Sequence, residues 1–388
     1  MSRAQNQLKT AQQLLERYRA GEPFHLYLKR YFSENKKHGS SDRKVLRDLC
    51  YSFFRIGHLW SELAFEDRIL SAYYVVHPAP MTFLQTLRPD WETPTSDDPV
   101  IRAKAIGRAL PVQSIFTYGG ACSADIDVEP FVLSHLKQPD LFIRIRPGRE
   151  KKVIDRLQAD RIPFQQVSPD SIALGNSTSL ESRFDLDEEV VVQDLSSQRI
   201  SDLFSLLPDR ATWKVWDACA ASGGKSILLF DHLPKIDLLC TDVRPSILRN
   251  LSTRLGRAGV PVRQIKSDDL SVNRDRSDYG SFDLIVADVP CSGSGTWART
   301  PEQISQFDER SIEDYSILQR KILSNLIPQL APNGYLLYLT CSVFAQENEE
   351  KVNYLMQKHS LISVEKRMIK GYLHRADSMF AALFQRSA

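Results

Sequence analysis

Two cysteines that follow apolar runs are the residues of this chain best suited to covalent chemistry. Cys291 lies in the turn Val-Pro-Cys-Ser-Gly after the run 282–288, and Cys341 ends the run 335–341. One cysteine at the end of a strand is usually a small buried hydrophobe, but two at neighbouring strand ends are not expected from packing. A thiolate that adds to C6 of a cytosine prepares C5 to take a methyl group, and an acid such as Asp288 can assist at N3. A second thiol can help to expel the first.

A turn with two glycines ends another apolar run, in the segment 217–226 (Asp-Ala-Cys-Ala-Ala-Ser-Gly-Gly-Lys-Ser). Glycines between a strand and a helix allow the backbone to approach a ligand closely. The end of this segment matches a phosphate-binding P-loop, but that motif needs a glycine where Cys219 stands. The nicotinamide fingerprint G-x-G-x-x-G is also absent. We therefore expect neither a phosphate cradle nor a nicotinamide site.

An acid at the end of the next apolar run points to a nucleoside ligand. Asp242 stands nineteen residues after Gly223, where it can accept hydrogen bonds from ribose hydroxyls. It can also cap the helix that Pro245 starts, and both roles can hold together. Asp268 can meet an adenine amino group or be a turn residue. A glycine turn and a ribose acid without a phosphate cradle favour an adenosyl ligand without phosphates, such as S-adenosylmethionine.

Alternating strands and helices from residue 213 must position these groups. The strand-like runs are 214–219, 238–243, 262–265, 282–288 and 335–341, and the helical segments between them are 224–232, 245–258 and 311–330. Continuous apolar strands between amphipathic helices are typical of a parallel sheet that is covered on both faces. Such sheets bind ligands at the carboxyl ends of their strands, where the strand order reverses.

The residues before this region predict two further parts. Residues 1–88 read as helices, and a strand at 141–146, a helix at 150–159 and short strands to 192 indicate a small α+β unit. Residues 1–60 hold 12 Lys and Arg against 5 Asp and Glu, which can serve nucleic-acid binding or a solvated helical surface. The α+β unit has a basic corner, which we expect to contact a nucleic-acid backbone: Arg144, Arg146, Arg149, Lys151 and Lys152.

Composition excludes several classes of protein. With 42% hydrophobic and 25% charged residues among 388, the chain is not a mostly disordered one. No run of about 18 apolar residues is present, so no membrane span is expected, and the first residues do not form a secretory signal. Six cysteines without a C-x-x-C pair predict neither a disulfide scaffold nor a zinc or other metal site. A reducing cytoplasm is the expected location.

The chain resembles the Fmu/Sun-type RNA cytosine-5 methyltransferases over about 135–388. The matching motifs are 217–225, Asp242, 288–296 (Asp-Val-Pro-Cys-Ser-Gly-Ser-Gly-Thr), and Thr-Cys-Ser at 340–342 followed by Gln-Glu-Asn-Glu at 346–349. Residues 192–198 resemble the entry to the family's catalytic domain, and residues 376–380 resemble its closing strand. The N-terminal part, with Ser-Ser-Asp-Arg at 40–43 and Phe54-Arg55, resembles the NusB-type helical RNA-binding domain more faintly.

The resemblance implies an α/β fold with three domains. A Rossmann-like, doubly wound methyltransferase sheet is expected over 201–388, after a small ferredoxin- or RRM-like α+β domain at 135–200 and an all-α, NusB-like RNA-binding domain at 1–134. The implied cofactor is S-adenosylmethionine. The implied cofactor-binding residues are Cys219, Ala220, Ala221, Ser222, Gly223, Gly224, Lys225, Asp242, Asp268 (or its neighbour Asp269) and Asp288.

The resemblance also implies the catalytic roles. Cys341 is the nucleophile, Cys291 assists product release, Asp288 lies between cofactor and base, and Lys225 lies near the base. In related DNA enzymes the cysteine after proline attacks instead, so the chemistry of the residues alone leaves the order of the two thiols open. Three positions depart from the family pattern: Ser222 replaces a proline, and Ile247 and Ala298 replace arginines. The first departure is expected to loosen the glycine turn.

The expected activity is methyl transfer to C5 of a cytosine in RNA through a covalent cysteine–C6 adduct. Ribosomal RNA of the 16S type, or a precursor of the small ribosomal subunit, is the expected partner, bound by a cytoplasmic monomer that does not contact a membrane. The alternatives are a tRNA substrate, or a non-catalytic RNA-binding or ribosome-assembly factor on a methyltransferase scaffold. An ATP-using enzyme is a third alternative, which Cys219 disfavours.

Overall fold

The computed structural model of the chain describes residues 2–77, 82–233 and 235–387. They form two compact units. The helical unit lies within residues 1–120, 127–138 and 296–309, and the α/β unit within residues 121–126, 139–295 and 310–388. The expected domain boundaries at 134/135 and 200/201 remain a prediction. In the part of the chain that the structure describes, no helix is both long enough and apolar enough to cross a membrane.

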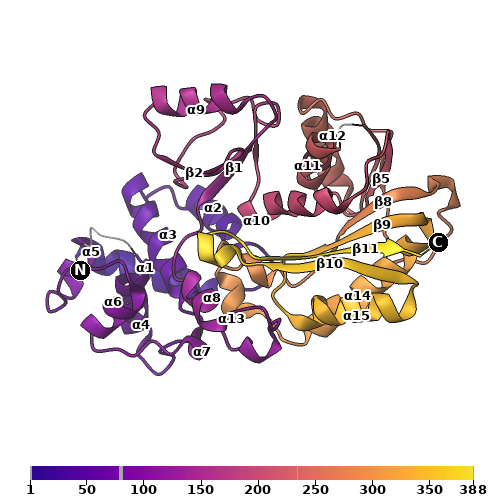
Figure 1. The fold of residues 1–388 in the computed structure, drawn as a ribbon. Helices are drawn as coiled ribbons and strands as arrows, with labels where there is room; N and C mark the ends of the chain where they lie inside the picture. Colours follow the sequence, from indigo (N-terminus) through magenta and orange to yellow (C-terminus); the bar gives the residue numbers. More distant parts are fainter. Residues whose placement is uncertain (1, 78–81, 234, 388) are drawn as a thin grey trace. The chain divides into compact units, whose positions relative to one another are not determined.

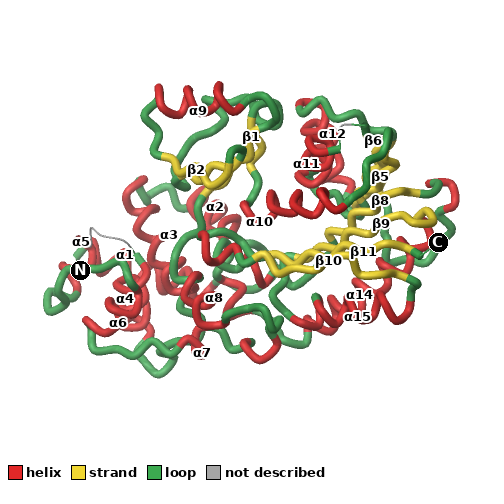
Figure 2. The backbone as a smooth tube through the Cα atoms, viewed as in Figure 1, coloured by secondary structure: helices red, strands yellow, loops and turns green. Residues whose placement is uncertain are grey.

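The described elements of the helical unit are helices joined by loops, drawn in red and green in Figure 2. Buried Arg55, at the end of α3, ties its three chain segments together, because its Nη1 donates to the carbonyl oxygens of His135 (2.6 Å) and Ala298 (2.9 Å). The α-helices are α1 (Arg3–Arg17), α2 (Phe24–Glu34), α3 (Ser40–Arg55), α4 (Phe65–Val76), α5 (Thr82–Leu87), α6 (Pro99–Ala105), α7 (Val112–Ile115), α8 (Val128–Ser134) and α13 (Glu302–Gln306).

The main sheet of the α/β unit has seven strands in the order β10-β11-β9-β8-β5-β6-β7. Figure 1 labels the strands from β10 to β5. The five strands from β9 to β7 in this order are parallel, and β10 and β11 are antiparallel to their neighbours. The strand order reverses between β5 and β8, which confirms the predicted Rossmann-like, doubly wound fold. The strands are β5 (Trp213–Asp217), β6 (Ile236–Asp242), β7 (Gln264–Ser267), β8 (Phe282–Asp288), β9 (Leu330–Thr340), β10 (Leu361–Ile369) and β11 (Met379–Arg386).

Helices cover both faces of this sheet, as its continuous apolar strands require. The face with α11 and α12 holds a cluster of buried aliphatic side chains that includes Val215 and Val286 of the strands and Leu228 and Leu251 of the helices. On the opposite face lie α14 and α15 (Figure 1). The helices are α10 (Leu195–Gln198), α11 (Gly224–His232), α12 (Pro245–Arg257), α14 (Ser311–Leu326) and α15 (Glu349–Lys358).

A second, smaller sheet precedes the main one in the sequence. Its four antiparallel strands have the order β2-β3-β1-β4, and Val153 and Leu157 of helix α9 pack in its core. Between β3 and β4 the chain forms turns rather than the second helix of a ferredoxin-like unit. The elements are β1 (Leu141–Ile145), α9 (Glu150–Ala159), β2 (Phe164–Ser168), β3 (Ser171–Leu174) and β4 (Val190–Val192).

The expectation that the basic corner contacts a nucleic-acid backbone is wrong for two of its arginines. The side chains of Arg144 and Arg146 are 2% and 9% exposed, and both bind the carboxylate of Asp231 in α11. Lys152 also has an acidic partner, the buried Glu189. Arg144 and Arg146 thus join the small sheet to α11 of the main one, whereas the Lys152 pair lies within the small unit. A run of basic residues does not reveal which of them meets a distant carboxylate.

Replacing Asp231 with alanine should therefore destabilise the protein strongly. The change leaves two buried guanidinium groups without their shared carboxylate, and breaking a buried ion pair from one side costs about 3–5 kcal/mol. The free energy of unfolding in urea measures this loss. The matched control is Asp155→Ala, which removes the carboxylate of an exposed pair with Lys151 and should cost about 0–1 kcal/mol. Equal, small losses in both variants would show that the buried pair does not hold the two sheets.

Candidate active site

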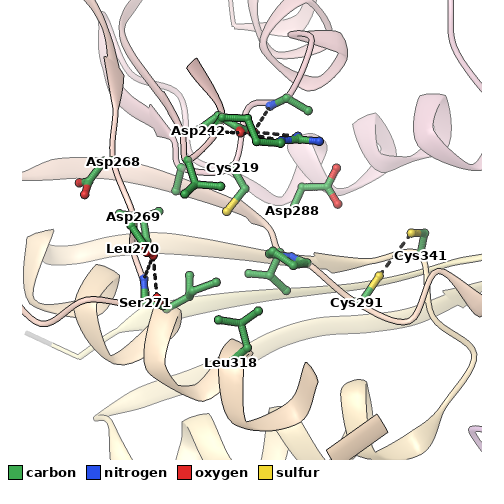
Figure 3. A pocket seen from close by; sticks show the side chains of 17 residues that line it. Cys219, Asp242, Asp268, Asp269, Leu270, Ser271, Asp288, Cys291, Leu318 and Cys341 are labelled. Atoms are coloured by element: carbon green, nitrogen blue, oxygen red, sulfur yellow. Dashed lines mark hydrogen bonds and ion pairs between the residues drawn. The ribbon is translucent and has the colours of Figure 1, made fainter. Parts of the chain in front are cut away.

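A cavity of about 610 Å³ opens at the carboxyl ends of the parallel strands, beside the point where their order reverses (Figure 3). It contains both predicted catalytic thiols and all of the predicted acids. Its lining comprises Ala218, Cys219, Ala221, Asp242, Val243, Arg244, Asp268, Asp269, Leu270, Ser271, Asp288, Val289, Pro290, Cys291, Leu318, Ile322 and Cys341. The structure thus brings together groups from five strand ends and from α14, as the sheet topology predicts.

The glycine turn after β5 reaches this cavity through its first half. Cys219 and Ala221 line the cavity, whereas Ala220, Ser222, Gly223, Gly224 and Lys225 are not among its lining residues. Gly223 has φ 88°, and a Cβ there would lie 2.6 Å from the Leu251 side chain, so this position requires glycine. Helix α11 starts directly after it, at Gly224. The turn thus begins at the cavity with Cys219 and Ala221 and passes directly into α11.

The small sheet holds the second half of this turn. Arg254 of α12 donates to the carbonyl oxygen and the hydroxyl of Ser222 at 3.0 and 2.9 Å. The same guanidinium is paired at 2.7 Å with Asp187, from the loop before β4. The hydroxyl at position 222 therefore gains a bond that a proline could not make. The expected loosening of the turn does not follow from this departure, since Ser222 is fixed from outside.

Asp242 lies at the end of β6, where an acid that binds ribose is expected, and its carboxylate already accepts hydrogen bonds from protein groups. Its carboxylate accepts from the backbone N–H of Ala221 at 3.0 Å and from the backbone and guanidinium of Arg244 at 2.9–3.1 Å. Burial raises the pKa of Asp242, but the bonds from Arg244 outweigh it and the net direction is down. The carboxylate is thus held ionised at the rim of the cavity. The exposed Arg244 side chain occupies positions that ribose hydroxyls would take.

Asp268 and Asp269, the two acids predicted as alternatives at the adenine, differ in how many hydrogen-bond donors already occupy their carboxylates. Asp268 is buried and accepts bonds from Arg276 (2.8 and 3.0 Å), Tyr279 (2.9 Å) and Arg274 (2.8 Å). Asp269 accepts bonds from the backbone and the hydroxyl of Ser271 at 2.9 and 2.6 Å. Both residues line the cavity, but four donors already saturate the Asp268 carboxylate. A contact of this carboxylate with adenine would need one of those donors to move.

An ion pair joins the glycine turn to the end of β8. The ammonium of Lys225 donates to Asp288 at 3.0 Å, and both side chains are largely buried. Asp288 ends β8 and points into the cavity in Figure 3. The pair thus places an ammonium group beside a carboxylate, and of the two residues only Asp288 lines the cavity.

The two predicted catalytic thiols are direct neighbours. The Sγ atoms of Cys291 and Cys341 lie 3.3 Å apart, at hydrogen-bond distance (Figure 3). Parallel pairing of β8 with β9, with Asp288 opposite Leu339, brings their turns side by side. The turns approach so closely that a Cβ at Gly295 would lie 2.2 Å from the Ser378 carbonyl oxygen and 3.0 Å from that of Cys341. Gly295 is therefore required by close approach.

The environment favours a neutral Cys291 thiol. The hydrogen bond to Cys341 raises the pKa of Cys291 well above its usual value, and burial and the nearby Glu347 act in the same direction. Burial, followed by the charge of Asp288, also raises the pKa of the Cys219 thiol. A thiol that stays protonated can donate a hydrogen bond to a neighbouring sulfur and stabilise it as an anion.

Sequence reasoning missed the apolar walls of the cavity. Val243 is 53% exposed and directly follows Asp242, while Leu270, Leu318 and Ile322 contribute from the loop after β7 and from α14. Such walls suit the faces of a planar ring beside a ribose acid. The position of Val243 after the strand-end acid was a usable signal, whereas the two residues of α14 carry none in the sequence. Among the described residues, no cluster of histidine, cysteine and acidic side chains could hold a metal ion.

Comparison with known proteins is consistent with this geometry. The sequence model of the family described as 16S rRNA methyltransferase RsmB/F matches residues 204–381. The ribosomal RNA small subunit methyltransferase B of Salmonella arizonae is 33% identical over 169 residues, which cover 44% of this chain and 38% of that protein. The protein of the same name from Xylella fastidiosa is 32% identical over 225 residues, 56% of this chain and 52% of that protein. The chain thus spans about half or less of the length of these two relatives.

Solved structures share the fold at lower identity. The crystal structure of the protein PH0851 has a TM-score of 0.70 and 19% identity, with 100% of both chains covered. The structure of NSun6 from Pyrococcus horikoshii with SFG has a TM-score of 0.59 and 15% identity, and it covers 68% of this chain and 94% of that one. These likenesses establish the arrangement of the elements.

The buried carboxyl of Asp217, at the start of the glycine turn, should make the free energy of unfolding depend on pH. Burial raises the pKa of Asp217 to about 7, and its Oδ1 has no partner among the described residues. Because the folded state binds this proton more tightly, the stabilisation is complete below pH 4 and is lost as pH rises toward 7. An asparagine at position 217 has no proton to lose in this range. The free energy of unfolding of Asp217→Asn, relative to that of the native protein, should therefore rise by up to about 4 kcal/mol between pH 4 and pH 7. Parallel stability curves for both proteins in urea would contradict the raised pKa.

Proposed function

We propose that this chain, which carries a domain of the 16S rRNA methyltransferase RsmB/F family over residues 204–381, transfers a methyl group to C5 of a cytosine in ribosomal RNA. The observation that carries the proposal is the contact between two thiols at 3.3 Å beside a Lys225–Asp288 ion pair. A single buried cysteine is explained by packing, but two thiols and the Asp288 carboxylate in one cavity, with Lys225 paired to that carboxylate, are suited to covalent catalysis on a pyrimidine.

The cavity has the groups that S-adenosylmethionine needs. The Cys219–Ala221 backbone would lie beside the methionine part, and Asp242 would accept the ribose hydroxyls once the Arg244 side chain moves aside. Val243 and Leu270 would flank the adenine. When bound, this cofactor supplies an electrophilic methyl group on sulfur. The described chain offers no glycine cradle for phosphates, and the acids at Asp242 and Asp288 would repel them.

Cys341 is the nucleophile in this proposal. Its sulfur forms a bond to C6 of the cytosine, and the electron pair of the C5–C6 double bond moves to C5, which then takes the methyl group. The protonated Cys291 thiol donates a hydrogen bond to the attacking sulfur and so favours its anionic form. The contact at 3.3 Å supports assistance of one thiol by the other, and the order of the two follows the resemblance to the cytosine-5 methyltransferases.

Asp288 and Lys225 act on the polar edge of the base. Addition of a thiolate at C6 pushes negative charge toward N3, where a proton or a hydrogen bond stabilises it. The Lys225 ammonium carries a proton next to the Asp288 carboxylate, at 3.0 Å. The pair can therefore hold a proton at N3 while the adduct exists, and take it back when the adduct breaks down.

Cys291 acts after the methyl group has arrived. When the Cys341 sulfur is bonded to C6, it no longer engages Cys291, and the largest cause of the raised pKa of Cys291 is removed. Cys291 can then release its proton to solvent and accept the proton from C5. The electrons of the C5–H bond restore the C5–C6 double bond and expel Cys341 as a thiolate, so atoms and charges balance.

We further propose that the substrate is 16S-type ribosomal RNA or a small-subunit precursor, bound by a cytoplasmic monomer. The support for the substrate is the match of residues 204–381 to the sequence model described as 16S rRNA methyltransferase RsmB/F. The target cytosine must be unpaired or turned out of its stack, since C6 is not reachable within a helix. The expected NusB-like role of residues 1–134 is part of this proposal. With Arg144 and Arg146 buried, backbone contacts must come from other cations.

The two cysteine variants should fail at different steps. Cys341→Ala should bind cofactor and RNA but form no methylcytosine and no covalent adduct, because it lacks the nucleophile. Cys291→Ala should still attack and transfer one methyl group, and then release product so slowly that an RNA-linked band accumulates on a denaturing gel. The double variant should give no band. Cys50→Ala, which alters a buried cysteine of the helical unit, serves as the control and should keep native activity.

The reverse pattern, with a band from Cys341→Ala and none from Cys291→Ala, would assign the attack to Cys291. Native activity in both single variants would refute the covalent mechanism. Methylation of tRNA in place of ribosomal RNA, read by bisulfite sequencing of total RNA from a deletion strain, would correct the substrate. Folded protein that binds RNA but no cofactor would favour a non-catalytic assembly factor.

A further inference from the structure

One buried carboxylate joins the two turns that carry the thiols. Glu347 lies in a short 3-10 helix (Ala345–Glu347) after β9 and is 0% exposed. It is not among the residues that line the cavity. It belongs to the Gln-Glu-Asn-Glu segment at 346–349, to which neither the cofactor site nor the reaction assigns a role.

The carboxylate of Glu347 accepts four hydrogen bonds, and three of them come from the cysteine turns. Its Oε1 accepts from the backbone N–H of Ser292 at 2.9 Å and from the side-chain amide of Gln319 at 3.0 Å. Its Oε2 accepts from the hydroxyls of Ser292, at 2.6 Å, and of Ser342. Since Ser292 follows Cys291 and Ser342 follows Cys341, one side chain is bonded to the neighbour of each thiol.

Neighbouring groups complete this frame on the other side of each cysteine. The amide of Gln319 also donates to the carbonyl oxygen of Pro290 at 3.0 Å. The amide of Asn348 accepts from the Thr340 hydroxyl at 2.6 Å and donates to the Ser342 carbonyl oxygen at 2.9 Å. The residues before and after each cysteine are therefore all fixed to side chains of one buried network.

We propose that Glu347 is a positioning residue whose carboxylate holds the Cys291 and Cys341 turns at the separation that lets one thiol assist the other. This inference rests on the proposed function for the use of the pair, but the separation itself is a property of the free protein. Glu347 touches neither sulfur, and it acts through Ser292 and Ser342. A carboxylate is suited to this task because it accepts four bonds from two directions.

The charge of Glu347 and its hydrogen bonds have opposite effects on the reactivity of the thiols. The two contributions can therefore be distinguished by experiment. Its charge contributes to the raised pKa of Cys291, so loss of the charge alone should make the thiol more reactive. Loss of the hydrogen bonds should let the turns move apart and make the thiol pair react more slowly. Glu347→Gln removes the charge but keeps an acceptor and gains a donor for the two hydroxyls, whereas Glu347→Ala removes both.

The test measures disulfide formation between Cys291 and Cys341 in the full chain without RNA. Diamide serves as the oxidant: it takes up the two thiol hydrogens as the S–S bond forms. Glu347→Ala should form this disulfide at least about tenfold more slowly than the native protein, and Glu347→Gln should match or exceed the native rate.

Methylation assays provide a second measurement. The kcat should fall about 10- to 100-fold in Glu347→Ala, with Kd for S-adenosylmethionine unchanged, and should return to within about threefold of the native value in Glu347→Gln. The matched control is Glu350→Gln, an exposed acid three residues along, which should change neither rate.

Each outcome is decisive. Native disulfide and methylation rates in folded Glu347→Ala would overturn the positioning role, and equal defects in Glu347→Gln and Glu347→Ala would assign the effect to charge and also overturn it. Should Glu347→Ala fail to fold, Ser342→Ala removes one bond on the Cys341 side and must slow disulfide formation for the proposal to stand. If the native protein makes no methylcytosine, the proposed function fails, while the disulfide rates still test the role of Glu347.

Discussion

Parallel pairing of β8 with β5 on one side and with β9 on the other is the constraint on which the site depends. The register places Asp217 opposite Val286 and Asp288 opposite Leu339, so three strands end together. The pairing continues into the turns, where the backbone N–H of Ala218 donates to Val286 and that of Val289 to Leu339. The glycine turn, Asp288 and the two thiols, which come from distant parts of the sequence, thereby meet in one cavity. No single segment of the chain contains all of these groups.

Buried charges then fix what the sheet brings together. The Arg254–Asp187 pair holds the glycine turn at Ser222, and Arg144 of β1 and Arg146 just after it share the Asp231 carboxylate of α11. Such pairs add little net stability over apolar packing, but each is costly to break from one side, so they specify one arrangement. The small sheet, expected to serve RNA, is in this respect part of the frame of the cofactor site.

The sequence was informative where one segment determines its own structure. Periodicity predicted β8 at 282–288 and α11 at 224–232 with the bounds that the structure has, because continuous apolar strands and glycine-led helices are local signals. It missed β10, an edge strand whose polar Glu365 to Arg367 obscure the apolar pattern. It also misjudged Arg144 and Arg146, because their partner Asp231 lies more than eighty residues away. The thiol pair was predictable from two strand ends, but the Glu347 network that joins them depends on three-dimensional proximity.

In the proposed reaction, Cys341 attacks a cytosine of RNA and Cys291 does not. A substrate RNA that carries 5-fluorocytosine at the target position tests it directly in the native protein, because fluorine at C5 cannot leave as a cation and the adduct persists after methyl transfer. Mass spectrometry of the digested adduct then identifies the peptide that bears the modified nucleotide. We expect a cofactor-dependent adduct on the sulfur of Cys341. An adduct on Cys291, or none although RNA and S-adenosylmethionine are both bound, would contradict it.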